Sequence, residues 1–151
     1  MNARSASPAD AEELARLHAH MVGADITGPW RDQLADHLRV RLGGHRLAAF
    51  VVDGPDDGLA ACAIGVVHQG LPGPDHGGVF GQIQTVVTEE RFRRRGYGRA
   101  VTDALIDWLT GRGCTLLNLT TSDAGKTLYA SLGFTPNARA MRLMGTPYHR
   151  A

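Results

Sequence analysis

Hydrophobic and polar residues follow two different periods along the chain, and each change of period marks the start of a new expected element. Apolar residues three or four positions apart predict helices, whereas short apolar or β-branched runs predict strands. The expected order is two helices, three strands, a helix, a strand, a short helix and a last strand. The predicted ranges are 8–21, 30–42, 46–53, 59–68, 79–88, a helix from Val101 onward, 114–120, 123–132 and 138–144. A short leading strand at residues 2–6 is left open.

The stretch 83–109 contains the strongest candidate chemistry. A buried-strand pattern at Ile83–Thr88 is followed by Arg93-Arg94-Arg95-Gly96-Tyr97-Gly98-Arg99 and then by an amphipathic helix. Glycines allow a sharp turn and let a ligand approach the backbone amides. A helix N-terminus adds unpaired N–H groups and the positive end of the helix dipole. The pattern therefore predicts an anion site suited to a diphosphate.

Composition narrows the class of protein. A chain of 151 residues with 43% hydrophobic residues is expected to form one domain, residues 1–151. A net charge of +1 argues against a general nucleic-acid or membrane-surface binder. No apolar run is long enough to cross a bilayer, and the N-terminus lacks a secretory signal, so a cytoplasmic location is expected. Cys62 and Cys114 form no CxxC motif, and we expect two buried thiols and no metal.

Two motifs resemble the GNAT superfamily of N-acyltransferases. Arg93, Gly96 and Gly98 match its acetyl-CoA-binding pattern between a strand and a helix, and the segment Leu128–Phe134, LYASLGF, resembles a second family segment. The resemblance covers roughly residues 5–144. It implies an α/β (α+β) fold with a mixed, mostly antiparallel central sheet flanked by helices, and acetyl-CoA as co-substrate.

The resemblance also implies roles for individual residues. The backbone of Val86, Val87 and Thr88 would pair with the pantetheine amides, and an N–H near Val86 or Val87 would stabilise the oxyanion. Tyr129 would protonate the departing thiolate, since a phenol and a thiol have similar pKa values. The residues expected to bind the phosphates of coenzyme A are Arg93, Arg94, Arg95, Gly96, Tyr97, Gly98, Arg99 and Lys126.

The sequence departs from the family at the general base. Many members have a Glu in the strand that here reads IQTVVT, and Gln84 stands at the position that most resembles it. An amide cannot accept a proton at neutral pH. The amine would then arrive neutral or lose its proton through water held by Gln84, Asn118 and Thr120. His68 and His76 are further candidates, whereas Glu89 and Glu90 are expected to be solvated or paired with arginines.

The expected activity is direct transfer of acetyl from acetyl-CoA to a primary amine on a small molecule or peptide. The acceptor itself is not determined, although Gly23–Arg31 and Gln69–Gly78 are expected to form its wall. A homodimer is left open. The alternatives are an acyl-CoA-binding module without turnover and a nucleic-acid binder that uses the arginine-rich turn. A P-loop at Thr120–Thr127 is disfavoured, because Thr120 stands where that motif needs glycine.

Overall fold

The computed structural model describes residues 2–23, 28–137 and 139–145. They form two compact units, Met1–Thr120 and Thr121–Ala151. The first unit contains the sheet, with strands β1 (Arg4–Ser5), β2 (Leu47–Asp53), β3 (Leu59–Gln69), β4 (Val79–Thr88) and β5 (Leu116–Leu119). Its helices are α1 (Ala11–Val22), α2 (Pro29–Arg41) and α3 (Tyr97–Gly111). The second unit contains α4 (Lys126–Ser131), and short 3₁₀ turns occur at Pro8–Asp10, Glu90–Phe92 and Asp123–Gly125.

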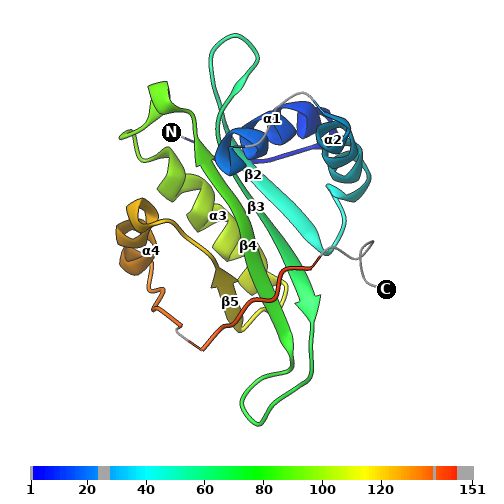
Figure 1. Cartoon of the computed structure of the whole chain (residues 1–151), viewed down its shortest axis with the longest axis vertical. Helices are drawn as coiled ribbons and strands as arrows, with labels where there is room; N and C mark the ends of the chain where they lie inside the picture. Colours follow the sequence, from blue (N-terminus) through cyan, green and yellow to red (C-terminus); the bar gives the residue numbers. More distant parts are fainter. Residues whose placement is uncertain (1, 24–27, 138, 146–151) are drawn as a thin grey trace. The chain divides into compact units, whose positions relative to one another are not determined.

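The five strands lie in the sheet in chain order (Figure 1). β1, β2, β3 and β4 pair antiparallel in succession, and β4 pairs with β5 in parallel because α3 connects them. The predicted mixed, mostly antiparallel sheet is therefore confirmed. The leading strand also forms, although it is only two residues long. Arg4 anchors it through ion pairs of 2.9 Å to Asp10 and to Asp53.

Helices cover both faces of this sheet. On one face, α1 and α2 bury an apolar cluster that includes Leu14, Leu17 and Leu38, together with Cys62 and Ile64 of β3. On the other face, α3 approaches so closely that a Cβ on Gly65 would lie 3.1 Å from the side chain of Leu105. Because helices cover both faces, β2 and β3 are nearly continuous runs of apolar and small residues and do not alternate.

The prediction of a last strand at 138–144 is wrong for residues 139–144. Ala138 lies outside the described residues, and residues 139–144 pair with no strand among those that are described. Met141 and Leu143 are 98% and 85% exposed, so their apolar side chains gain nothing from burial here. A segment forms a strand only where another strand supplies the ladder of hydrogen bonds.

Candidate active site

The turn between β4 and α3 has the backbone geometry of an anion site. Arg94 and Gly96 have positive φ angles of 65° and 81°, and α3 begins at Tyr97. The Ala100 N–H donates to the Gly96 carbonyl over 3.0 Å, so the N–H groups of Tyr97 and Gly98 have no acceptor within the helix. These amides and the positive end of the helix dipole favour a negative ligand at this turn.

The two glycines of the motif have different structural roles. The sequence analysis assigned the sharp turn to both, but among these two only Gly96 has a positive φ. Gly98 lies in the first turn of α3, where its carbonyl accepts a 2.7 Å hydrogen bond from Thr102. Gly98 is therefore not needed for the turn itself. Its missing side chain leaves the helix N-terminus open to a ligand.

The arginines of the turn carry positive charge that carboxylates do not neutralise. Arg93, Arg94 and Arg95 are exposed, and none forms an ion pair with a described carboxylate. Arg93 instead donates to the Thr88 carbonyl over 3.2 Å, which connects the turn to the end of β4. Glu89 pairs with Arg16 and with Arg91, as the sequence analysis expected of it. The three turn arginines therefore remain available to an anionic ligand.

The second half of β4 has an open backbone edge. Pairing between β4 and β5 covers Phe80–Ile83 against Leu116–Leu119 and stops there, although β4 continues to Thr88 (Figure 1). No other described strand takes the place of β5 along residues 84–88. Unpaired strand edges bind extended chains through backbone hydrogen bonds. This edge ends at the arginine-glycine turn.

The pairing on the other side of β4 shows which amides face the open edge. The Glu89 N–H donates to the carbonyl of Ala60 in β3 over 2.9 Å. Because N–H directions alternate along an antiparallel strand, the Val87 N–H also points toward β3. The N–H groups of Val86 and Thr88 then point to the open edge. Of the two expected oxyanion donors, this alternation favours Val86 over Val87.

A β-bulge at Gln84 separates the two halves of β4. Ile64 pairs with Thr85 and the next residue, Gly65, pairs with Ile83, so Gln84 has no partner on β3. Gly65 faces α3, whereas Thr85 contacts α1, so the side chains change face across the bulge. Gln84 is exposed. Gln82 stands two residues before Gln84, and an unbroken strand would place both on one face, but the bulge interrupts this period of two.

His18 is a titratable residue that the sequence analysis did not select. Its Nδ1 lies 2.7 Å from the hydroxyl of the buried Thr85, next to the bulge. Its ring also lies 6.4 Å from that of Trp30 in an edge-on arrangement. Burial lowers the pKa of the His18 imidazole, which keeps it neutral near pH 7. A histidine among the apolar positions of the helix 8–21 was the available signal in the sequence.

The histidines that the sequence analysis did consider lie at the β3–β4 loop. His68 is exposed and stacks on Phe80 with ring centroids 5.0 Å apart, and His76 accepts a hydrogen bond from Gly78. Asp75 is also exposed in this loop. Of the other proposed acceptor wall, Trp30 is half-buried, and Asp25 lies outside the described residues. Among the described residues, neither His68 nor His76 makes a hydrogen bond or ring contact with the bulge in β4, whereas His18 contacts Thr85 beside it.

Tyr129 lies in the second unit, on α4. Its carbonyl accepts the Phe134 N–H, and Gly133, with φ 99°, donates to Ala130, so the predicted glycine C-cap is confirmed. The rings of Tyr129 and Phe134 meet edge to face at 5.9 Å. The half-buried Tyr129 hydroxyl makes no hydrogen bond within the described part of the chain, and burial raises its pKa. The phenol is therefore a protonated acid at neutral pH.

Lys126 and the cysteines complete the candidate residues. Lys126 forms an exposed 2.9 Å ion pair with Asp123, which still leaves its charge accessible. Cys62 and Cys114 are buried free thiols, and burial raises the pKa of Cys62 to about 12, so this thiol is a poor nucleophile. Over residues 2–23, 28–137 and 139–145, no three His, Cys, Asp or Glu residues gather as metal ligands. Nor is any described helix long and apolar enough to cross a membrane.

Solved structures with similar folds include several acetyltransferases. A predicted acetyltransferase from Clostridium acetobutylicum, crystallised with acetyl-CoA, has a TM-score of 0.82 at 20% identity, over 95% of each chain. A GCN5-related N-acetyltransferase from Ralstonia eutropha JMP134 has a TM-score of 0.79 at 23% identity, over 95% of this chain and 97% of that one. Glucosamine-6-phosphate N-acetyltransferase from Arabidopsis thaliana scores 0.75 at 21% identity, over 95% and 97%. At these identities the likeness is one of fold.

Sequence comparison identifies the family. No curated protein matches the chain significantly by sequence. The family model described as the acetyltransferase (GNAT) family, however, matches residues 14–134, which include the β4 edge, the arginine-glycine turn and Tyr129. The chain therefore belongs to the GNAT family of acetyltransferases.

Proposed function

We propose that the protein transfers an acetyl group from acetyl-CoA to a primary amine on a small molecule or peptide, in one direct step. The observation that carries this proposal is the separation of β4 from β5 after Ile83, which leads into an anion site at the start of α3. The open edge supports an extended pantetheine arm, and the turn supports its diphosphate. The two sites follow one another along the chain, as one elongated ligand requires.

The phosphates would bind to the turn. Arg93, Arg94 and Arg95 would supply charge, while the amides of Tyr97 and Gly98 would donate hydrogen bonds from the helix N-terminus. Arg99 and Lys126 would add positive charge. Thr88 would bind the pantetheine through its outward N–H group, the outward N–H of Val86 would remain for the thioester carbonyl, and Val87 would hold the strand in place through its pairing with β3.

The reaction would form one bond and break one. The neutral amine nitrogen attacks the thioester carbonyl, the oxyanion accepts a hydrogen bond from the Val86 N–H, and the carbon–sulfur bond breaks. The family resemblance gives Tyr129 the role of acid, which protonates the leaving thiolate. Its raised pKa supports that role, because the hydroxyl retains its proton at the pH of the reaction.

The proton that the amine loses needs an acceptor other than a carboxylate on β4. We propose that His18 accepts it, directly or through water, while the exposed Gln84 at the bulge orients the amine or that water. Two observations support His18: it is bonded to Thr85, the residue after the bulge, and burial keeps its imidazole neutral. Asn118 and Thr120 remain further sites for ordered water.

The test is an acetylation screen across amines, amino acids and peptides, read by release of the free thiol. Amine-dependent thiol release is the expected result. Calorimetry with acetyl-CoA should be run on the same preparation, together with the variant Gly98→Asp, which adds a carboxylate at the helix N-terminus. Tight binding without thiol release for any amine would instead support a binding module. Unchanged affinity in the folded Gly98→Asp variant would refute the anion site.

A further inference from the structure

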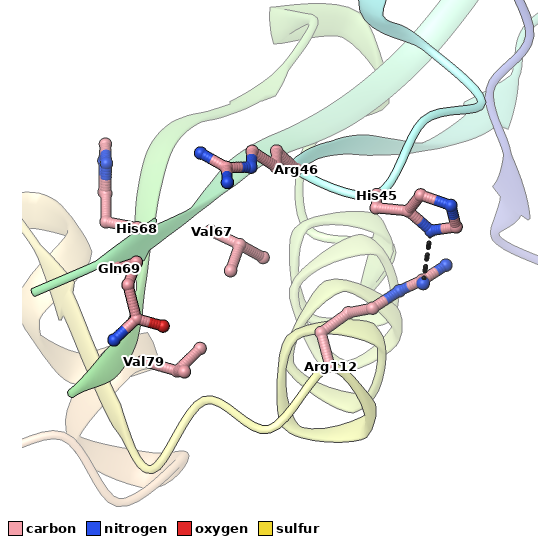
Figure 2. A pocket seen from close by; sticks show the side chains of 7 residues that line it. All are labelled: His45, Arg46, Val67, His68, Gln69, Val79 and Arg112. Carbon is pink, nitrogen blue, oxygen red and sulfur yellow. Dashed lines mark hydrogen bonds between the residues drawn. The ribbon is translucent and has the colours of Figure 1, made fainter. Parts of the chain in front are cut away.

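A second basic site lies at the opposite end of β4 from the arginine-glycine turn. There the start of β2, the end of β3, the start of β4 and the end of α3 surround a cavity of about 290 Å³ (Figure 2). The size is close to the lower limit for small-molecule sites, about 300 Å³. The residues that line it are His45, Arg46, Val67, His68, Gln69, Val79 and Arg112.

The cavity exists because α3 ends before the strands that it covers. Leu105 and Leu109 of α3 pack over Gly65 and Gly81. Two residues further along the same face are Val67 of β3 and Val79 of β4, and α3 has already ended at Gly111. Val67 and Val79 are consequently only half-buried and form an apolar floor.

Two arginines from different elements line this cavity without a carboxylate: the Arg46 guanidinium lies near Val67, and the Arg112 guanidinium is turned toward His45 (Figure 2). Arg46 precedes β2, and its backbone carbonyl accepts the Val67 N–H over 2.8 Å. Its exposed side chain makes no hydrogen bond or ion pair with any described residue. Arg112 follows α3, and its guanidinium carbon lies 4.9 Å from the centre of the Trp108 ring. Arg112 also donates to Nδ1 of His45 over 2.9 Å (Figure 2). No Asp or Glu lines the cavity. The positive charge of the site is therefore not balanced by the residues around it.

The end of α3 does not neutralise Arg112 either. The carbonyls of Trp108, Leu109 and Thr110 already accept backbone N–H groups from residues 112–114. The bond to His45 orients Arg112, because an arginine only donates, so the His45 Nδ1 accepts. Toward the β3–β4 loop, the Gln69 amide donates to the carbonyls of Gly70 and Gly77 and forms that edge of the cavity. Arg112 is thus held in place with donors left over for a ligand.

We propose that this cavity binds the phosphate or carboxylate group of a small organic anion, at a site separate from the one proposed for acetyl-CoA. Two arginines match the oxygens of such a group, since guanidinium groups bind oxyanions through paired, charge-assisted hydrogen bonds. The valine floor fits the carbon skeleton of the ligand. The proposal does not depend on acetyl transfer, because no residue of the cavity takes part in the proposed reaction.

The test must separate this site from the arginine-glycine turn, which also attracts anions. The ¹⁵N–¹H NMR spectrum of the full chain is recorded while inorganic phosphate, and separately acetate, is added to millimolar concentration at constant ionic strength. We expect saturable shifts of the amides of Arg46, Val67 and Arg112. Arg46→Gln should raise the fitted dissociation constant at least tenfold. Because the Arg46 side chain has no partner among the described residues and the backbone bond to Val67 is kept, the fold should be retained.

Matched variants complete the experiment. Arg93→Gln should reduce shifts at Gly96 and Gly98 but leave those at the cavity, whereas Arg46→Gln and Arg112→Gln should do the reverse. Shifts from phosphate alone would assign a phosphate ligand, and shifts from both anions would assign an oxyanion of either kind. The proposal is overturned if neither anion shifts the cavity amides, if chloride reproduces the shifts, or if they persist unchanged in both cavity variants.

Discussion

The change Tyr129→Phe tests the proposed mechanism most sharply, because the structure separates catalysis from stability at this residue. The variant retains the ring, and with it the edge-to-face contact with Phe134 at 5.9 Å. It also retains the backbone hydrogen bonds that cap α4, from Gly133 to Ala130 and from Phe134 to Tyr129. The hydroxyl has no partner among the described residues, so its loss removes no internal hydrogen bond. We therefore expect an unchanged melting temperature.

The expected effect on turnover is large. General acid catalysis typically contributes about 10²–10⁴-fold, which corresponds to about 2.7–5.5 kcal/mol of transition-state stabilisation. Turnover should fall within that range while the affinity for acetyl-CoA, measured by calorimetry, stays the same. Turnover is measured by thiol release at saturating amine and acetyl-CoA.

The pH profile provides a control that a purely structural role would not affect. Burial raises the pKa of the Tyr129 phenol above its usual value of about 10, so wild-type turnover should fall only on the alkaline side of that value. Tyr129→Phe should lack this alkaline decline. Turnover near that of the wild type in a folded variant would remove Tyr129 from the mechanism and leave the thiolate to be protonated by water.

Three further changes test the proposed proton acceptor His18, the role of Gln84 and the ion pair between Arg16 and Glu13. His18→Gln retains a hydrogen-bonding group beside Thr85 but removes the basic nitrogen, so we expect kcat/KM to fall about 10²-fold. In the wild type, kcat/KM should decline at acid pH as His18 is protonated, below the usual histidine pKa because burial lowers it. This acid decline should be absent from the variant. An unchanged acid decline would exclude His18. Gln84→Glu should extend activity to lower pH if the new carboxylate meets the amine or a bridging water, and an identical profile would show that it meets neither. Arg16→Gln should lower the unfolding free energy by about 1–2 kcal/mol at neutral pH. Because the Arg16 hydrogen bond lowers the pKa of Glu13, this stability is present above the unfolded-state pKa and is lost as acid protonates Glu13. Urea titrations of the wild type and Arg16→Gln at several pH values measure the difference in unfolding free energy. An equal difference at acid pH would refute the dependence on Glu13 protonation.

The elements that local sequence controls were predicted well. The turn at Gly96 requires a left-handed residue, and the Gly133 cap has a similar requirement, so both could be predicted from the residues themselves. The spacing of Val101, Leu105 and Leu109 likewise identifies the buried side of α3, and these residues are fully buried. Each of these features depends on residues within one or two turns of each other.

The features that depend on distant partners were not predicted. The residues 138–144 were expected to form a last strand, but residues 139–144 pair with no other strand among the described residues. The Gln84 bulge is equally invisible in the sequence, since it is defined by the pairing of Ile64 with Thr85 and of Gly65 with Ile83. Pairing register is a property of two strands, and a single strand does not contain it.

The same division applies to the site. Sequence alone was sufficient to locate the arginine-glycine turn, the strand before it and the family, because their residues are contiguous. The contact of His18 with Thr85 joins residues 67 positions apart, and the cavity of Arg46 and Arg112 joins the start of β2 to the end of α3. These residues meet only after the sheet and its helices have packed. Their burial and their neighbours determine their protonation state and reactivity, and both are properties of the folded chain.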